Sequence, residues 1–253
     1  MGISITEIKE LRSRTNAGMM ACKSALEKAN GSMQEAIANL RKSGEVKLAK
    51  KQDRATKEGV IAICGKVIVK ILCETDFVAR NKNFIDYAKK IASLADQDGI
   101  TKARKYFDDK KAEKIQSIGE NIILEEIEKV EEGKVIDGYV HSNNKLGALV
   151  VLDGGTSEQA RDIAMHIVAM DPPVINPENI PQSELDSETK IYMEQLKTEK
   201  KPEQIWDKII AGKLNKYKVE RALMTQAFVK NPEQSIAEYL SPAKVLKFIR
   251  LAV

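Results

Sequence analysis

The strongest constraint on the fold of this chain is a pattern of apolar residues that occurs twice along it. In the first occurrence, two runs rich in β-branched residues, 60–64 and 67–74, lie on either side of Gly65-Lys66. Alternating apolar residues around a two-residue turn are typical of a β-hairpin. A helix-spaced apolar stripe begins at Phe84, and a further strand is expected over about 122–130. This stretch predicts a small sheet with helices packed on it.

The same order of elements recurs in the second half of the chain. The runs 135–140 and 146–152 predict another hairpin, and a helix is expected over about 157–170. Strand-like runs follow at 223–229 and 245–253. We therefore predict an α+β fold with antiparallel sheets, built by duplication of one unit. The expected core subdomains are 58–134 and 135–253.

The first 44 residues show a different, helical period and predict three short helices. Ser4 and Glu7 form a capping box, and Asn30-Gly31 is a stop signal after the second helix. Gly44 is expected to end the third helix, so the predicted N-terminal domain is 1–44. Residues 45–57 are rich in Lys and Arg with few apolar residues, which predicts a basic, solvated linker.

A helical excursion interrupts the second half of the core at about 181–222. The mixed-charge run 185–201 favours a helix, and Pro202 suits only the first turn of the next one. Two helices joined in this way predict a protruding antiparallel hairpin, similar to a short coiled coil.

Charge and composition exclude several classes of protein. The net charge is only +4, and its excess lies in residues 1–57, with 12 Lys and Arg against 6 Asp and Glu. No apolar run approaches the roughly 18 residues of a membrane helix, and no signal-peptide core begins the chain. Three cysteines make a disulfide framework improbable. These features predict a cytoplasmic protein that does not bind membranes.

No catalytic constellation is visible in the sequence. Neither His141 nor His166 has neighbouring residues at metal-ligand spacing. The segment from Gly59 to Gly65-Lys66 has five intervening residues where a phosphate-binding loop has four, and Val67 replaces the required Ser or Thr. We therefore expect no enzyme activity, no cofactor and no bound metal.

Two apolar pairs allow alternative interpretations. Phe77-Val78 follows the first hairpin among charged residues, so Phe77 either folds back onto its own core or is presented to a partner as an apolar wedge. Met19-Met20 places two adjacent side chains where a helix stripe needs only one. We expect one of them in the core and the other available for contact.

Two long motifs carry a resemblance to a known family. Residues 11–26, LRSRTNAGMMACKSAL, resemble the N-terminal signature L-R-x-R-T-G-A-G-M-M-D-C-K-x-A-L of the elongation factor Ts family. Residues 75–81, TDFVARN, match its second signature, T-D-F-V-A-[KR]-N. Shorter similarities follow in the same order at 118–122, 164–169, 212–216 and 226–229. The chain departs from the first signature at Asn16 and Ala21, where Gly and Asp are usual.

The resemblance implies a three-helix domain like ubiquitin-associated domains, a duplicated core and a helical hairpin. It also implies a guanine-nucleotide exchange factor that acts on elongation factor Tu, with no direct contact to nucleic acid. The residues implied to dislocate the partner's Mg²⁺ are Thr75, Asp76, Phe77 and Val78. Further contacts are implied for Arg12, Met19, Met20 and, by position, His141.

The N-terminal region would also suit two other functions. The three helices alone would suit recognition of a nascent chain or of a ubiquitin-like protein, which a pulldown from lysate would distinguish. The basic segment 1–57 would suit RNA binding, but it contains no aromatic residue and therefore no platform for base stacking.

Overall fold

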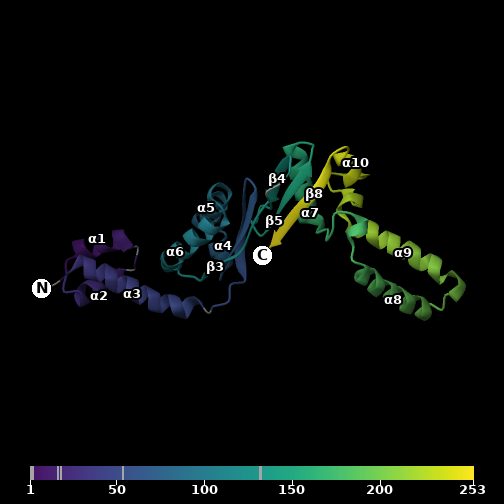
Figure 1. Ribbon diagram of the computed structural model, residues 1–253. Helices are drawn as coiled ribbons and strands as arrows, with labels where there is room; N and C mark the ends of the chain where they lie inside the picture. Colours follow the sequence, from purple (N-terminus) through teal and green to yellow (C-terminus); the bar gives the residue numbers. More distant parts are fainter. Residues whose placement is uncertain (1–2, 16, 18, 53, 131–132) are drawn as a thin grey trace. The chain divides into compact units, whose positions relative to one another are not determined.

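The computed structural model of the protein describes residues 3–15, 17, 19–52, 54–130 and 133–253 (Figure 1). The chain divides into two compact units, each with its own three-stranded sheet. The first unit comprises 1–129 with the short segments 143–145 and 252–253, and the second comprises 130–142 and 146–251. The prediction of an α+β fold with antiparallel sheets is confirmed.

Three helices open the first unit: α1 (Ile5–Thr15), α2 (Met19–Lys28) and α3 (Met33–Gln52). The Ser4 hydroxyl accepts from the Glu7 N–H, and the Glu7 carboxylate accepts from the Ser4 N–H, which completes the predicted capping box. Leu11, Cys22 and Leu26 are fully buried in the small core that the helices share.

The prediction that Gly44 ends the third helix is wrong, because α3 continues to Gln52. A glycine inside a helix costs only about 1 kcal/mol relative to alanine, and the residues after it are good helix formers with no proline. Most of the predicted linker 45–57 is therefore helical. Helix α1 ends at Thr15 and α2 begins at Met19; Asn16 and Gly18, between them, lie outside the described residues.

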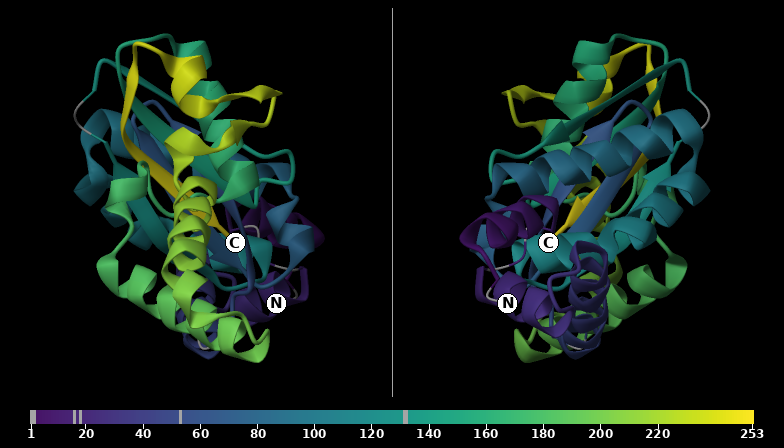
Figure 2. Two further views of the ribbon diagram at one scale, coloured as in Figure 1. Left: turned by 90° about the vertical axis from the view of Figure 1, so that its right-hand side faces the viewer. Right: turned by 90° about the vertical axis from the view of Figure 1, so that its left-hand side faces the viewer.

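The sheet of the first unit has the order β1-β2-β3, antiparallel throughout. Helix α5 packs on β1 and β2, and α6 packs on α5 and β3 (Figure 2). Phe84 and Ile91 project from α5 into the core. The bounds of the elements are β1 (Glu58–Cys64), β2 (Val67–Cys73), α4 (Asp76–Ala79), α5 (Lys82–Asp98), α6 (Ile100–Ile118) and β3 (Ile122–Lys129).

The turn at Gly65-Lys66 joins β1 to β2, as predicted. Gly65 has φ +52°, and a Cβ there would lie 2.3 Å from Asp96 Oδ2. Asp96 also accepts a hydrogen bond from the Lys66 N–H at 3.1 Å. The Asp96 carboxylate therefore lies directly against this turn.

The sheet of the second unit has the order β4-β5-β8, and β4 and β5 form the second predicted hairpin. Helix α7 packs on both of these strands. A two-stranded sheet, β6 with β7, and the short helix α10 complete this core. The bounds are β4 (Val135–Val140), β5 (Leu146–Asp153), α7 (Ser157–Met170), η1 (Pro177–Asn179), η3 (Leu223–Thr225), β6 (Ala227–Phe228), β7 (Asn231–Ser235), α10 (Ile236–Leu240) and β8 (Lys244–Ala252).

The prediction of one strand over 223–229 is wrong. The segment forms the 3₁₀ turn η3 and then only the two residues of β6. Polar side chains explain the difference, since Thr225 Oγ1 donates to the Val219 carbonyl at 2.7 Å and Gln226 Nε2 donates to the Glu220 carbonyl at 2.7 Å. These bonds tie the segment back to the preceding helix instead of a sheet.

The predicted helical hairpin consists of α8 (Gln182–Thr198), the short η2 (Glu203–Ile205) and α9 (Trp206–Arg221) (Figures 1 and 2). Glu184 near the start of α8 binds both Tyr217 and Arg221 near the end of α9, so the helices are antiparallel. At the other end of the hairpin, Trp206 Nε1 donates to the Lys201 carbonyl at 2.9 Å.

Candidate functional site

The segment 74–80, called here the Phe77 turn, leaves β2 and contains the one-turn helix α4. Phe77 is 83% exposed, whereas Ala79 is buried and Val78 packs against the core. Successive residues of a helix point in different directions, so Val78 and Ala79 can face the protein while Phe77 faces solvent. The alternative that Phe77 folds back onto its own core is wrong.

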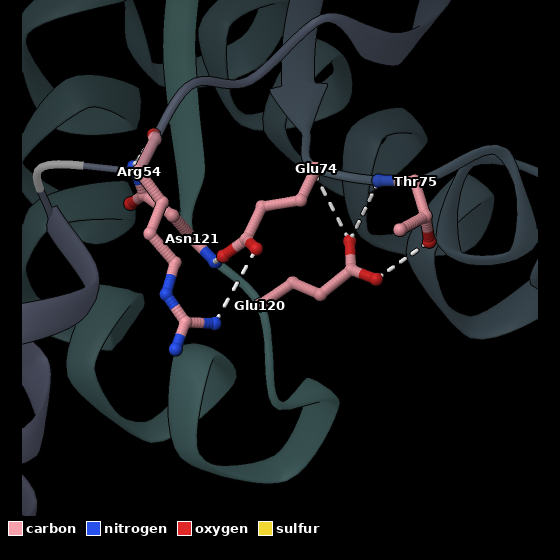
Figure 3. A network of polar contacts seen from close by, with 5 residues as sticks. All are labelled: Arg54, Glu74, Thr75, Glu120 and Asn121. Carbon is pink, nitrogen blue, oxygen red and sulfur yellow. Dashed lines mark hydrogen bonds and ion pairs between the residues drawn. The ribbon is translucent and has the colours of Figure 1, made fainter.

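Thr75 is the N-cap of α4, and its hydroxyl accepts from the Val78 N–H. A carboxylate that is distant in sequence holds this cap (Figure 3). Glu120 Oε2 accepts from the N–H groups of Glu74 and Thr75, each at 3.0 Å, and Oε1 accepts from the Thr75 hydroxyl at 2.5 Å. One carboxylate therefore receives three hydrogen bonds from the residues that lead into α4.

Three more contacts surround the same cap. The Glu74 carboxylate accepts from the Asn121 N–H at 2.7 Å and pairs with the Arg54 guanidinium at 3.4 Å (Figure 3). Cys73 Sγ donates to the Thr75 carbonyl at 3.3 Å. Burial, assisted by the nearby Glu120 carboxylate, raises the pKa of the Cys73 thiol to about 12. The sulfur therefore keeps the proton that it donates.

The exposed face of the Phe77 turn also carries charge. Asp76 is the first residue of α4 and pairs with Arg80 one turn later at 3.1 Å. Asp76 and Phe77 are adjacent, so the turn presents a carboxylate beside an exposed aromatic ring.

The N-terminal candidates lie on the surface of their own helices. Met20 is 77% and Met19 52% exposed, so the expectation that one of them belongs to the core is wrong. Cys22, Ala25 and Leu26 already fill the buried stripe of α2, which leaves both methionines outside. Arg12 and Ala21 are exposed as well. Asn16, the other departure from the family signature, lies outside the described residues.

The two histidines differ in their surroundings. His141 follows β4, is exposed, and its Nδ1 lies 3.1 Å from the Tyr139 hydroxyl. His166 is fully buried in α7, with Nε2 2.9 Å from Gln226 Oε1, and its Nδ1 accepts from the Val229 N–H. Burial lowers the pKa of His166. His166 is therefore a buried side chain with a hydrogen-bond partner at each ring nitrogen.

The residues that hold the Phe77 turn, Glu120 and Arg54, were not singled out as site residues from the sequence. Glu120 follows Gly119, which ends α6 in the left-handed conformation with φ +92°. A motif match at 118–122 was the available signal, but nothing local indicated a bond to Thr75, 45 residues earlier.

Among the residues that the structure describes, no cluster of three His, Cys, Asp or Glu side chains is placed to hold a metal ion. Within those same parts of the chain, no helix is both long and apolar enough to cross a membrane.

Comparison with known proteins identifies the family. The family model described as elongation factor TS matches residues 74–253, beginning at the Phe77 turn. Proteins named elongation factor Ts from Marinobacter nauticus and Hydrogenovibrio crunogenus are 42% and 39% identical, over 99% and 100% of this chain and 91% and 92% of their own. The one from Halothermothrix orenii is 40% identical over 95% of this chain and 88% of its own. The chain therefore belongs to the elongation factor Ts family of translation elongation factors.

Proposed function

We propose that this protein is a guanine-nucleotide exchange factor that accelerates the release of GDP from elongation factor Tu in the cytoplasm. The observation that supports the proposal best is the exposed Phe77 on a turn held by Glu120. A large apolar side chain kept in water at a fixed place is suited to enter a partner protein.

In this proposal, Phe77 and Asp76 enter the partner near its Mg²⁺ site, and Thr75 and Val78 hold them in position. The bound Mg²⁺ supplies much of the charge that compensates the phosphates of GDP. Dislocating it weakens GDP binding, and by thermodynamic reciprocity GDP weakens binding of the factor by the same ratio. No covalent bond changes, so this role needs neither a catalytic residue nor a cofactor.

The remaining candidates contribute binding rather than dislocation of the ion. Arg12, Met19 and Met20 form one exposed contact and His141 another, away from the Phe77 turn in sequence. Substitution of Arg12 or Met20 should therefore raise the factor concentration needed for half-maximal effect and leave the maximal rate of GDP release nearly unchanged.

The test is stopped-flow release of fluorescent GDP from elongation factor Tu, at saturating factor, with wild type and Phe77→Ala. Loss of a central contact worth about 2 kcal/mol or more should lower the maximal rate roughly 30-fold. Met170→Ala, which also removes an exposed apolar side chain, should have no effect. Chelation of Mg²⁺ should reduce the difference in the rate of GDP release between Phe77→Ala and wild type. An unaltered rate with Phe77→Ala would contradict the proposal.

A further inference from the structure

The helix that carries Phe77 is too short to hold its own shape. Helix α4 has four residues, and the first turn of any helix is unfavourable, since it fixes several dihedral angles for one hydrogen bond. Its persistence therefore depends on contacts with the rest of the protein. Among the described residues, Glu120 supplies the most direct of these contacts at its N-terminus.

We propose that Glu120 is a positioning residue for Phe77, acting through Thr75. The inference rests on the function proposed above for Phe77 and extends it to a residue outside the Phe77 turn. Glu120 lies just after Gly119, which ends α6, and reaches the turn through hydrogen bonds (Figure 3).

The path from Glu120 to α4 consists of two consecutive hydrogen bonds. The Thr75 hydroxyl gives its only proton to Glu120 Oε1 at 2.5 Å, so its lone pairs are left to accept from the Val78 N–H at 3.5 Å. Val78 is the residue after Phe77. Orientation of the hydroxyl by the carboxylate thereby favours the cap that shapes the turn around Phe77.

A carboxylate suits this position better than any other side chain. Three donors converge on Glu120, two backbone N–H groups and one hydroxyl, and a carboxylate is the side chain that only accepts. A glutamine would have the same shape but would turn an N–H₂ group toward at least one of these donors. Glu120→Gln should therefore loosen the turn without removing any apolar contact.

The first experiment needs no partner and measures amide hydrogen exchange in the free protein by NMR. In Glu120→Gln, the amides of Glu74 and Thr75 should exchange roughly tenfold faster or more, because a neutral amide group replaces the charged acceptor of both hydrogen bonds. Amides in the middle of β2 should keep their rates. The control Glu113→Gln removes a carboxylate from the exposed face of α6, where it pairs with Lys110 at 2.8 Å. It should leave the exchange rates of both groups of amides unchanged.

The second experiment is a double-mutant cycle on stopped-flow GDP release from elongation factor Tu. Glu120→Gln should lower the maximal rate about tenfold and change the half-saturating factor concentration less than about twofold. In the Phe77→Ala background it should have no further effect, since the side chain that it positions is absent. A general loss of stability would instead raise the half-saturating concentration and add to Phe77→Ala.

Thr75→Val is the second variant, should Glu120→Gln fold poorly, because it removes the hydroxyl and leaves the carboxylate in place. It should also lower the maximal rate. Unchanged Glu74 and Thr75 amides, or effects that add to Phe77→Ala, would overturn the inference while the proposed function stands. If wild-type factor does not accelerate GDP release, both the proposed function and the effect of Glu120 on GDP release are contradicted. The amide exchange rates then still decide whether Glu120 holds the turn.

Discussion

In each half of the duplicated core, a short segment joins the second strand of the hairpin to the next helix. This segment, called the corner here, is built differently in the two halves. In the second half, Gly154 and Gly155 turn the chain after β5 with φ +97° and +81°, and Thr156 caps the 14-residue α7 at once. In the first half no glycine is present at the corner. Thr75 caps the four-residue α4 in nearly the same conformation, and only then does the long helix α5 begin.

The source of support for each cap differs accordingly. The Thr156 cap is closed locally by Gln159 from the same helix, with bonds of 3.0 and 3.1 Å. The Thr75 cap is closed by Glu120, which belongs to a different element. The corner at Thr156 is thus stabilised by a residue of its own helix. The corner that exposes Phe77 is stabilised by a residue that is distant in the sequence.

The largest effect is expected when two phenylalanines of the first half, Phe77 and Phe84, are compared. Phe84 is 1% exposed and Phe77 is 83% exposed. Phe84→Ala should lower the free energy of unfolding by about 3–5 kcal/mol, and Phe77→Ala by less than about 0.5 kcal/mol. Urea denaturation followed by circular dichroism would measure both. A comparable loss for Phe77→Ala would mean that its ring packs within the protein.

Gly155→Ala should have an intermediate effect, in the second half only. Alanine in the left-handed conformation costs about 1–2 kcal/mol, and the new Cβ would lie 2.8 Å from Gln159 Oε1 and 3.2 Å from the Ala243 Cβ. We expect a loss of about 1–3 kcal/mol. Gly154→Ala is the matched control, because it has the same kind of φ but meets only the Ala243 Cβ at 3.9 Å. Equal losses would show that the contact with Gln159 adds nothing.

Thr156→Ala tests whether the second corner depends on its local cap. Removal of an N-cap side chain costs typically about 1 kcal/mol, and here it also frees Gln159 from the capping box. Thermal unfolding should show a lower midpoint for Thr156→Ala and no change for Ser157→Ala, whose side chain does not cap the helix. GDP release should be the same for both, in contrast with Thr75→Val.

The smallest effect at neutral pH is expected from His166. Because burial lowers the pKa of His166 in the folded state, the unfolded chain takes up a proton first as the pH falls below about 6.5. The free energy of unfolding should therefore be constant above that pH and decline below it. His166→Gln should reduce the difference in the free energy of unfolding between pH 7.5 and pH 5.5. His141→Gln, at an exposed position, should leave that difference unchanged. An equal decline in both variants would assign the pH dependence to other groups.

Much of the fold could be predicted because it rests on short-range patterns. The hairpin turned at Gly65-Lys66 and the helix over 157–170 appear as expected. Predictions of secondary structure were wrong where several opposing interactions together decide the conformation. The propensity of the residues after Gly44 outweighs one glycine in α3, and side-chain bonds to the preceding helix keep 223–225 out of a sheet.

Candidate site residues could be named from the sequence, but their geometry could not. The motif around Phe77 indicated a partner contact, yet whether the ring is buried depends on how Val78 and Ala79 fill the inner side of the turn. For Met19 and Met20, the outcome depends on which face of α2 is buried. Cys22 and Leu26 occupy that face, so both methionine side chains lie outside the core. The part played by Glu120 depends on a contact that only the folded chain creates.

The position of Trp206 has a practical consequence for spectroscopy. It is the only tryptophan of the protein, and it lies at the far end of the helical hairpin, bonded to the Lys201 carbonyl. Its emission will therefore report on the hairpin tip and stay nearly silent while either sheet opens. A fluorescence transition that precedes the loss of circular dichroism would be the signature of local fraying at that tip rather than of an unfolding intermediate of the core.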